Sequence, residues 1–464
     1  MLAALAAPSC VSLDSKPDVQ KAEANVQDRT GYVVPWNEPW AKDMAWDGEA
    51  PLTVDVAVLA ALANNGEIRA LVEQVSASRA DLAQAGLLPN PVVSISVRVP
   101  LDGGPVISPV GVSVTQSFVA LWLRGPRMRA ADARLNQSIL TLSNSALELV
   151  AKVKAAHARI VFGQRGLELQ DASIARARGV LESLRQHPDQ EAELEQARIE
   201  QLLLVAESDR TRLCMQLARR KRELLRLMGR ADSGDEWTAK DASNEEGFDS
   251  HPPLLPRDFS EEDARALALL QRLDVAASLA VVEANKKDLN VEERNRIRDL
   301  GIGVVVQQTQ DELRSLGLQN SIPLFDFNQA RIAKAGSLGR AALATAEATF
   351  QRAIMEARVA HGDAFASRDV AAQYRNGALP LARRNFERSL VAIGEDSIDR
   401  RVLCETLATL ASSEQTANDL ELEAAIAGIE LERAVGGSLR PIATPATMER
   451  AEPGKETGPD AESP

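Results

Sequence analysis

The sequence predicts a mainly α-helical protein with a small β part, made of two tandem copies of one unit. The chain has 464 residues, and Lys154–His157 recurs in similar form as Arg358–His361, 204 positions later. Arg127–Ala131 is answered at the same offset by Arg331–Ala335. A constant offset of this size indicates a duplicated structural unit rather than a short solenoid repeat. Each copy has long stretches with the apolar spacing of helices and a short stretch with the spacing of strands.

The composition favours long packed helices and argues against several functional classes. Aromatic residues make up 3% of the chain, so alanine, leucine, valine and isoleucine must supply most of the buried area. A net charge of −13, without a basic stripe carrying aromatic residues, argues against a nucleic-acid partner. Because the sequence shows no nucleophile–base set, phosphate loop or metal-ligand cluster, we expect no enzyme, cofactor or metal site. Cys214 and Cys404 lie in apolar helical contexts and are predicted to be small buried thiols.

Residues 1–51 are interpreted as a truncated export signal followed by an N-terminal tether. The apolar stretch Met1–Ser9 has no positively charged start and leads directly to Cys10. We take Cys10 as the candidate lipid-attachment site of an exported lipoprotein; the alternative is an ordinary apolar terminus. The polar stretch that follows is read as an extended tether that docks through Trp36, Trp40 and Trp46.

The first regular element is predicted to be a helix that opens at Leu52–Asp55. Thr53 or Asp55 can accept hydrogen bonds from the free N–H groups of its first turn. We expect the helix to end at about Gln84, because a glycine and two prolines follow within a few residues.

A β-hairpin is predicted next, at residues 92–118. Apolar residues alternate there with small polar ones, and a turn-forming stretch at 102–105 separates the two strands. The second unit carries a weaker version of the same pattern at residues 301–325.

After each hairpin the apolar spacing becomes that of a long helix in a coiled coil. Over 139–167 apolar or small residues step alternately by three and four, and positions 204 residues later are again mostly apolar or small. We expect a helix of about 55 residues over 127–184, roughly 80 Å long at about 1.5 Å per residue. A return helix follows to about Met228. Pro380 should kink or divide the long helix of the second copy.

These elements give the chain two equivalent units. The first, residues 52–228, contains the helical hairpin 124–228, and the second, residues 259–436, contains the helical hairpin 327–435. We expect residues 229–258 to form an inter-repeat linker. The tail at 437–464 is rich in glycine, proline and glutamate and is predicted to be disordered.

This order of elements resembles the outer-membrane efflux protein family, the TolC-like exit ducts of bacterial tripartite pumps. Leu52–Asn65 looks like the opening helix of the family, and Ala80–Pro91 is similar to its helix-to-strand junction. Ile322–Arg331 resembles its second strand-to-helix junction. The likeness covers about residues 52–436. The tether with Cys10 resembles the heavy-metal and drug efflux lipoprotein branch.

The resemblance implies a passive duct that exports small molecules or metal ions and has no chemistry of its own. It implies a homotrimer in the outer membrane with a periplasmic extension. Tandem helical hairpins would form an α-barrel, and four strands per chain would contribute to a trimeric 12-stranded β-barrel. The implied partners are a periplasmic adaptor (membrane fusion protein), an inner-membrane pump of the RND type and outer-membrane lipid. The candidate lipid-facing residues of the barrel are Val93, Ile95, Val97, Val112, Val114, Ile302 and Val304.

Four acidic residues near the helical turns are candidates for the periplasmic tip, or gate. Repeated around a threefold axis, they would form an acidic constriction that favours cations; the alternative is a solvated turn. They are Asp189, Glu395, Asp396 and Asp399.

His157 and His361 occupy equivalent positions in the two copies. A metal-relay role is one hypothesis, but two histidines without a carboxylate or cysteine cluster favour a solvated helix face instead.

Two other functions stay open from the sequence. A periplasmic adaptor is also built on coiled-coil hairpins, although it would carry one hairpin between β-rich halves. A structural or non-conducting coiled-coil lipoprotein is favoured by strands shorter than the roughly nine to eleven residues of a membrane span. It is also favoured by the scarcity of aromatic residues, because near the strand ends there are only Phe118, Trp122, Phe325 and Phe327.

Overall fold

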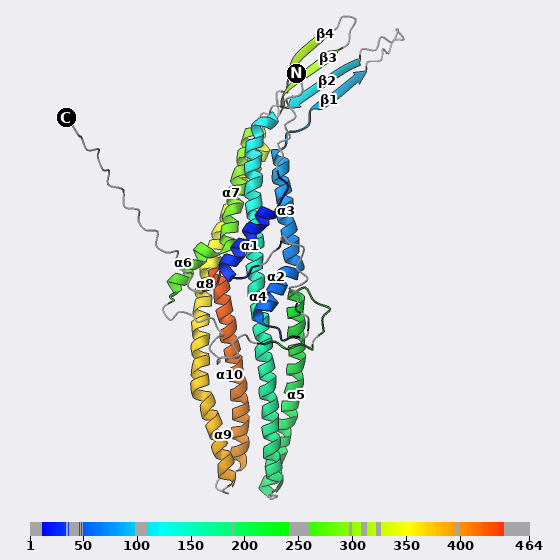
Figure 1. Cartoon of the computed structure of the whole chain (residues 1–464). Helices are drawn as coiled ribbons and strands as arrows, with labels where there is room; N and C mark the ends of the chain where they lie inside the picture. Colours follow the sequence, from blue (N-terminus) through cyan, green and yellow to red (C-terminus); the bar gives the residue numbers. More distant parts are fainter. Residues whose placement is uncertain are drawn as a thin grey trace, which may run out of the picture.

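The computed structural model is an elongated bundle of long helices with a small sheet at one end (Figure 1). It describes residues 12–33, 36, 46, 48, 50–97, 110–117, 119–186, 190–234, 236–240, 259–296, 299–307, 313–321, 326–394 and 400–439. Cys10, Trp40 and the four candidate tip residues lie outside these ranges.

The first unit contains a helix pair, two strands and a long helical hairpin. An additional helix precedes it. These elements are α1 (Lys16–Thr30), α2 (Val54–Asn64), α3 (Gly66–Gly86), β1 (Val92–Val97), β2 (Val110–Ser117), α4 (Val119–Gln186) and α5 (Gln190–Leu227).

The second unit repeats the helix pair, the strands and the hairpin in the same order. Its elements are α6 (Glu261–Gln271), α7 (Leu273–Arg294), β3 (Asp299–Gln307), β4 (Leu313–Ser321), α8 (Gln329–Gln373), the π-helical turn η2 (Tyr374–Ala378), α9 (Leu379–Gly394) and α10 (Arg400–Val435).

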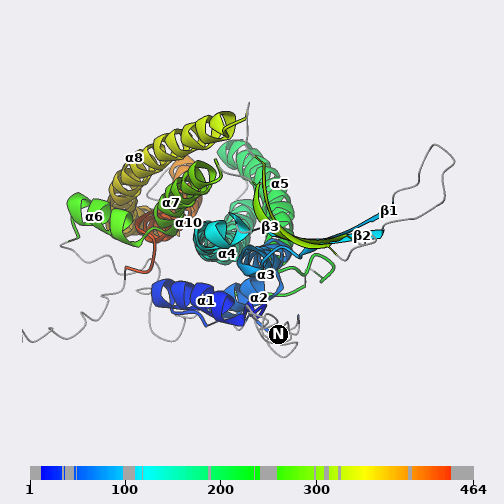
Figure 2. The same ribbon diagram turned by 90° about the horizontal axis from the view of Figure 1, so that it is seen from above.

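The expected extended tether contains a helix, α1, which lies along one side of the bundle (Figure 2). Its buried carboxylate Asp18 forms an ion pair with Arg79 of α3 at 2.5 Å, which fixes α1 on the first unit. Trp36 and Trp46 are buried, and the Trp36 indole donates to the Leu62 carbonyl at 3.1 Å. The sequence correctly predicted that Trp36 and Trp46 dock on the protein, but it did not predict helix α1.

The single opening helix expected in each unit is instead a pair of helices with a break of one residue. Asn65 separates α2 from α3 with an extended ψ of 124°, and its side chain accepts from the N–H groups of Glu67 and Ile68. Arg272 makes the equivalent break between α6 and α7. The expected cap of the first helix is confirmed, because the Thr53 hydroxyl accepts from the Val56 N–H.

The coiled-coil spacing correctly located the long helices but underestimated α4. This helix has 68 residues, about 100 Å at about 1.5 Å per residue, and continues through Pro126 to Val119. Within it, the predicted apolar positions from Ile139 to Ile160 are buried. In α8 the buried positions are mainly alanines, which let the neighbouring helices approach closely.

The predicted interruption at Pro380 is confirmed as a π-helical turn directly before it. A proline inside a helix lacks one N–H donor and clashes with the preceding turn. The five-residue turn η2 inserts the extra backbone that relieves this conflict before α9 continues.

The four strands form one antiparallel sheet in the order β1-β2-β3-β4. The pairing of β2 with β3 joins the two units, so the sheet belongs to both. In this chain β1 and β4 are its two edges.

Part of the expected inter-repeat linker is packed rather than free. Leu52 pairs with Ala239 in a short parallel bridge. The buried Trp237 ring packs edge-on against the Trp46 ring, with 5.3 Å between the two ring centroids. Residues 241–258 lie outside the described ranges.

None of the helices in the described ranges combines the length and the apolar character needed for a membrane span.

Candidate functional site

One face of the sheet collects the predicted apolar positions. The register places Val93 opposite Val114 and Val114 opposite Val304, while Ile95 lies opposite Val112. Because paired residues of a pleated sheet point to the same side, and every second residue does so too, all seven candidate lipid-facing residues share one face. Val97 lies opposite Val110 and Ile302 lies opposite Gln116, which places Val97 and Ile302 on this face too.

The described side chains of this face are open to the surroundings. Val93 is 60% exposed, Ile95 is 70% exposed and Val114 is 41% exposed. Ser94 and Ser113 pair with each other on the opposite face. The opposite face is mixed, because Val92 and Val305 lie on it with these serines, and contact of the apolar face with lipid stays a prediction.

Below the sheet, the long helices form a continuous wall. Helix α4 packs against α5 and α10, and α10 packs against α8. Nearer the sheet, α7 lies between α4 and α8. The two helical hairpins, α4–α5 and α8–α9–α10, run side by side along the long axis (Figure 1).

Three ion pairs, whose members on α4 are seven residues apart, join α4 to α5. Arg178 contacts Glu207 at 2.7 Å, and Arg185 contacts Glu200 at 3.1 Å. Asp171 and Arg210 form the third pair. All three are well exposed, so each contributes at most about 1 kcal/mol, and their main effect is to define the alignment of the two helices.

A second series of ion pairs, at eleven-residue intervals on α4, joins the two units. Lys154 contacts Glu432 at 3.0 Å, and Arg165 contacts Glu421 at 2.6 Å. The third pair is Arg176 with Glu414. Their carboxylates are 6–13% exposed, so these pairs are less screened than those between α4 and α5. Eleven residues are close to three helical turns, which keeps the three basic residues on one side of α4.

An apolar cluster close to the helical turns joins both hairpins. It includes Leu184 of α4, Ile199 of α5, Phe386 of α9 and Leu403 of α10. Cys404 belongs to this cluster, as expected for a small buried thiol, whereas Cys214 is half-buried.

The Cys404 thiol is expected to be unreactive at this position. Burial, followed by a hydrogen bond with Glu195, raises the pKa of the Cys404 thiol to about 12. Glu195 is itself buried, with one oxygen paired to Arg198 at 2.9 Å. The candidate tip residues Asp189, Glu395, Asp396 and Asp399 lie outside the described residues, between α4 and α5 and between α9 and α10 in the sequence, and their gate role stays a prediction.

The two equivalent histidines have a structural role, and the expectation of a solvated helix face is wrong for His157. His157 is 1% exposed, and its Nε2 donates to the Leu52 carbonyl at 2.9 Å. The half-buried His361 makes the same bond to the Phe259 carbonyl at 2.9 Å. Each histidine therefore holds the segment that leads into the first helix of its unit. In the described ranges, no three His, Cys, Asp or Glu side chains gather as a metal site would require.

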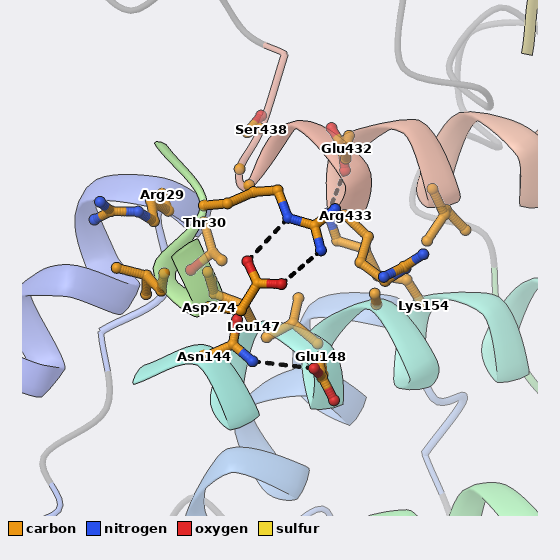
Figure 3. Close-up of a pocket in the computed structure, with 17 residues that line it drawn as sticks. Arg29, Thr30, Asn144, Leu147, Glu148, Lys154, Asp274, Glu432, Arg433 and Ser438 are labelled. Atoms are coloured by element: carbon orange, nitrogen blue, oxygen red, sulfur yellow. Dashed lines mark hydrogen bonds and ion pairs between the residues drawn. The ribbon is translucent and has the colours of Figure 1, made fainter. Parts of the chain in front are cut away.

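A small cavity lies where the two units and helix α1 meet (Figure 3). The Arg272 guanidinium beside it donates to Asp274 at 2.9 and 2.7 Å and to Glu356 at 2.8 Å. Arg29 of α1 donates to the Gln271 carbonyl at 3.0 Å, and the Ser438 N–H donates back to the Arg29 carbonyl at 2.8 Å.

The charged groups at this junction are paired with one another and hold the packed segments together. Burial would lower the pKa of Arg272, but its hydrogen bonds to Asp274 and Glu356 outweigh it and raise that pKa. Burial would raise the pKa of Asp274, but the hydrogen bond and the positive charge of Arg272 outweigh it and hold that pKa below its usual value. Both groups are therefore charged at neutral pH.

Sequence reasoning missed the junction around Arg272 and the ion pairs between the units. A signal for the pairs was present, since Lys154, Arg165 and Arg176 are evenly spaced on α4. Their acidic partners lie more than 230 positions away, and only the packing of α4 on α10 reveals them.

The comparisons with known proteins identify the fold. No protein-family description matches the chain, and no curated protein matches its sequence. Solved structures do match. CusC, described for its transmembrane channel formation, is 16% identical with a TM-score of 0.69, covering 87% of this chain and 94% of CusC.

Two further matches are channels. The outer-membrane channel OprN is 16% identical with a TM-score of 0.67, covering 90% of this chain and 95% of its own. The MtrE outer-membrane channel of Neisseria gonorrhoeae is 14% identical with a TM-score of 0.66, covering 83% and 89%. The resemblance to the TolC-like fold that the sequence indicated is confirmed at the level of the fold.

Proposed function

We propose that this chain is the outer-membrane channel subunit of a tripartite efflux system, a passive homotrimeric duct. It would export small molecules or metal ions from the periplasm. The observation that carries the proposal is a four-stranded sheet with two free edges, continued by a helical wall that is also open on both sides. In the described residues, a single chain forms an open sheet and an open wall rather than a closed tube.

The sheet is incomplete without other copies. Unpaired edge strands expose backbone hydrogen-bonding groups, which cannot be left unsatisfied in a lipid environment. Pairing β1 of one copy with β4 of the next removes both edges. Three copies of four strands would give a closed antiparallel barrel of about twelve strands, within the range of outer-membrane barrels.

The helical wall has the same property. Its outer helices α5 and α8 expose large apolar residues that a neighbouring copy would cover. On α5, Leu204 is 70% exposed and Met215 is 56% exposed. On α8, Leu343 is 50% exposed. Because α5 and α8 are the outermost long helices of the wall, ring closure would bring α5 of one copy next to α8 of the next.

The remaining features of the proposal follow from the resemblance. The duct would reach from the outer membrane into the periplasm and dock on a periplasmic adaptor and an inner-membrane pump of the RND type. Cys10 would carry a lipid anchor. The acidic residues Asp189, Glu395, Asp396 and Asp399 would form the periplasmic tip.

A non-conducting coiled-coil lipoprotein is the second candidate. It is favoured by β1, whose described part has six residues against roughly nine to eleven for a full membrane span. An adaptor is less well supported, because the chain has two helical hairpins in tandem and a single shared sheet.

The proposal is tested by extracting the full-length protein from outer membranes and measuring its mass in detergent and its conductance in planar bilayers. We expect the mass of three chains and stable ion-conducting events. A monomer without conductance excludes the duct, and a trimer without conductance favours the structural lipoprotein.

A substitution in β3 links the conductance to the sheet. Val304→Pro should abolish conductance, because proline removes a ladder hydrogen bond from a central strand. Val304→Ser keeps the backbone ladder and serves as the matched control.

A further inference from the structure

A band of exposed apolar side chains surrounds the place where the helices meet the sheet. Its members come from the end of α3, the start of α4 and the segment before α8, which all lie at the base of the sheet (Figure 1). The apolar collar consists of Leu87 (50% exposed), Leu88 (45%), Leu121 (47%), Trp122 (69%) and Phe327 (54%).

Exposed basic residues lie at the same helix–sheet junction as the apolar collar. None of them forms an ion pair with another residue in the described part of the chain. Each is within about 12 Å of a helix end, taking about 1.5 Å per residue. The basic ring consists of Arg127, Arg294, Arg296, Arg331 and Lys334.

The local charge is opposite to that of the whole chain. Over 119–134, 286–296 and 326–340, lysine and arginine outnumber aspartate and glutamate by about two to one. The complete chain has 53 lysines and arginines against 66 aspartates and glutamates. Positive charge is therefore concentrated at the helix–sheet junction of an acidic protein.

An apolar band next to unpaired cations matches the chemistry of a bilayer surface. Tryptophan, phenylalanine and leucine lie favourably at the boundary between acyl chains and headgroups. Long basic side chains next to that boundary reach lipid phosphates, and arginine can bind a phosphate oxygen pair with two hydrogen bonds. A lysine or arginine near an anionic membrane surface contributes about 1 kcal/mol.

We propose that the basic ring binds the headgroup phosphates of anionic phospholipids in the leaflet that faces the helices, with the apolar collar seated at the edge of the acyl chains. The inference rests on the proposed function, because it requires the sheet to lie in the membrane. It adds a lipid partner of defined charge and fixes the depth of the protein at the level of Trp122.

The test uses electron spin resonance of spin-labelled lipids around the full-length protein in phosphatidylcholine vesicles. The spectrum separates lipids held at the protein surface from free lipids. It therefore gives the association of phosphatidylglycerol relative to phosphatidylcholine. We expect about a fivefold preference for phosphatidylglycerol at low salt, equivalent to about 1 kcal/mol. Because the interaction is ionic, 1 M salt should remove the preference.

Two variants locate the effect. Replacing all five residues of the basic ring with glutamine should abolish the preference. The control replaces five exposed basic residues far from the sheet, which also have no ion pair in the described structure, and should leave the preference unchanged. The control positions are Arg219, Arg226, Arg375, Arg384 and Arg388.

The outcomes separate this inference from the proposed function. Surface-held lipid of both kinds without a preference, or a preference unaffected by salt, overturns the inference and leaves the duct intact. A change in ion selectivity of the channel with an unchanged lipid preference also overturns it, since the basic ring would then line the water-filled interior. If the wild-type protein holds no lipid at all, both proposals fail.

Discussion

Replacing Arg272 should loosen the packing of the α6–α7 break against α8 inside the second unit, beside its junction with the first unit. The Arg272 side chain is 7% exposed and binds Asp274 and Glu356, whose side chains are 19% and 25% exposed. Arg272→Met keeps the aliphatic stem but leaves both carboxylates without their main partner. Removing one member of a buried ion pair costs about 3–5 kcal/mol. Arg352 and Arg433, at 3.8 and 3.5 Å from these carboxylates, compensate in part.

We therefore expect a local loss of about 2–3 kcal/mol, below the full range for a buried pair. At about 1.4 kcal/mol per factor of ten, amide hydrogens at the junction should exchange roughly 30- to 150-fold faster. Native-state hydrogen exchange by mass spectrometry on the full-length protein measures this in peptides covering residues 272–280 and 430–438.

Arg178→Met is the matched control, because Arg178 forms an exposed pair with Glu207. That variant should change local stability by less than about 1 kcal/mol. The reasoning is refuted if Arg272→Met accelerates exchange at the junction no more than Arg178→Met does.

Three further predictions concern single residues. His157→Leu removes one of two hydrogen bonds to the buried Leu52 carbonyl, which also accepts from the Lys240 N–H at 2.9 Å, and should cost about 0.5–1.5 kcal/mol; His361→Leu should cost less, because water can replace the bond at the half-buried site, and thermal unfolding compares the two. Cys404 should resist a maleimide at pH 8 while the half-buried Cys214 reacts, because burial and the hydrogen bond to Glu195 raise the pKa of Cys404 to about 12; equal labelling contradicts this. The pKa of Asp274 is lower in the folded protein, although burial opposes the change, so its stabilising contribution is complete above about pH 4 and disappears as pH falls through the lowered value. After correction for the intrinsic exchange rate at each pH, protection at the junction should fall there in the wild type but much less in Asp274→Asn.

The long helices could be predicted because their signal is repeated many times. In α4 each buried position from Ile139 to Ile160 adds to the same coiled-coil pattern, and the second copy repeats it. The strands could also be predicted, because apolar residues such as Val93 and Ile95 alternate with polar ones. The register extends this apolar face from β1 and β2 to β3 of the second unit. Such elements depend on local periodicity, which a sequence displays directly.

Other features depend on contacts between distant segments and could not be predicted. The break at Arg272 matters because its guanidinium reaches Glu356, 84 positions away. His157 looked like a surface residue on a helix, but the segment carrying Leu52 covers it. The long helix was expected from residue 127, whereas α4 begins eight residues earlier at Val119, nearer the sheet.

The most direct test of the duct is a cross-link between the two edge strands of neighbouring copies. In a chain with Cys10, Cys214 and Cys404 replaced by serine, single cysteines are placed along β1 (Val92–Val97) and β4 (Leu313–Ser321), one in each strand. If three copies close one barrel, at least one combination should oxidise in the native membrane to a covalently closed trimer. If every combination yields only monomers while the protein remains folded, the sheet is not closed by neighbouring copies and the duct does not exist.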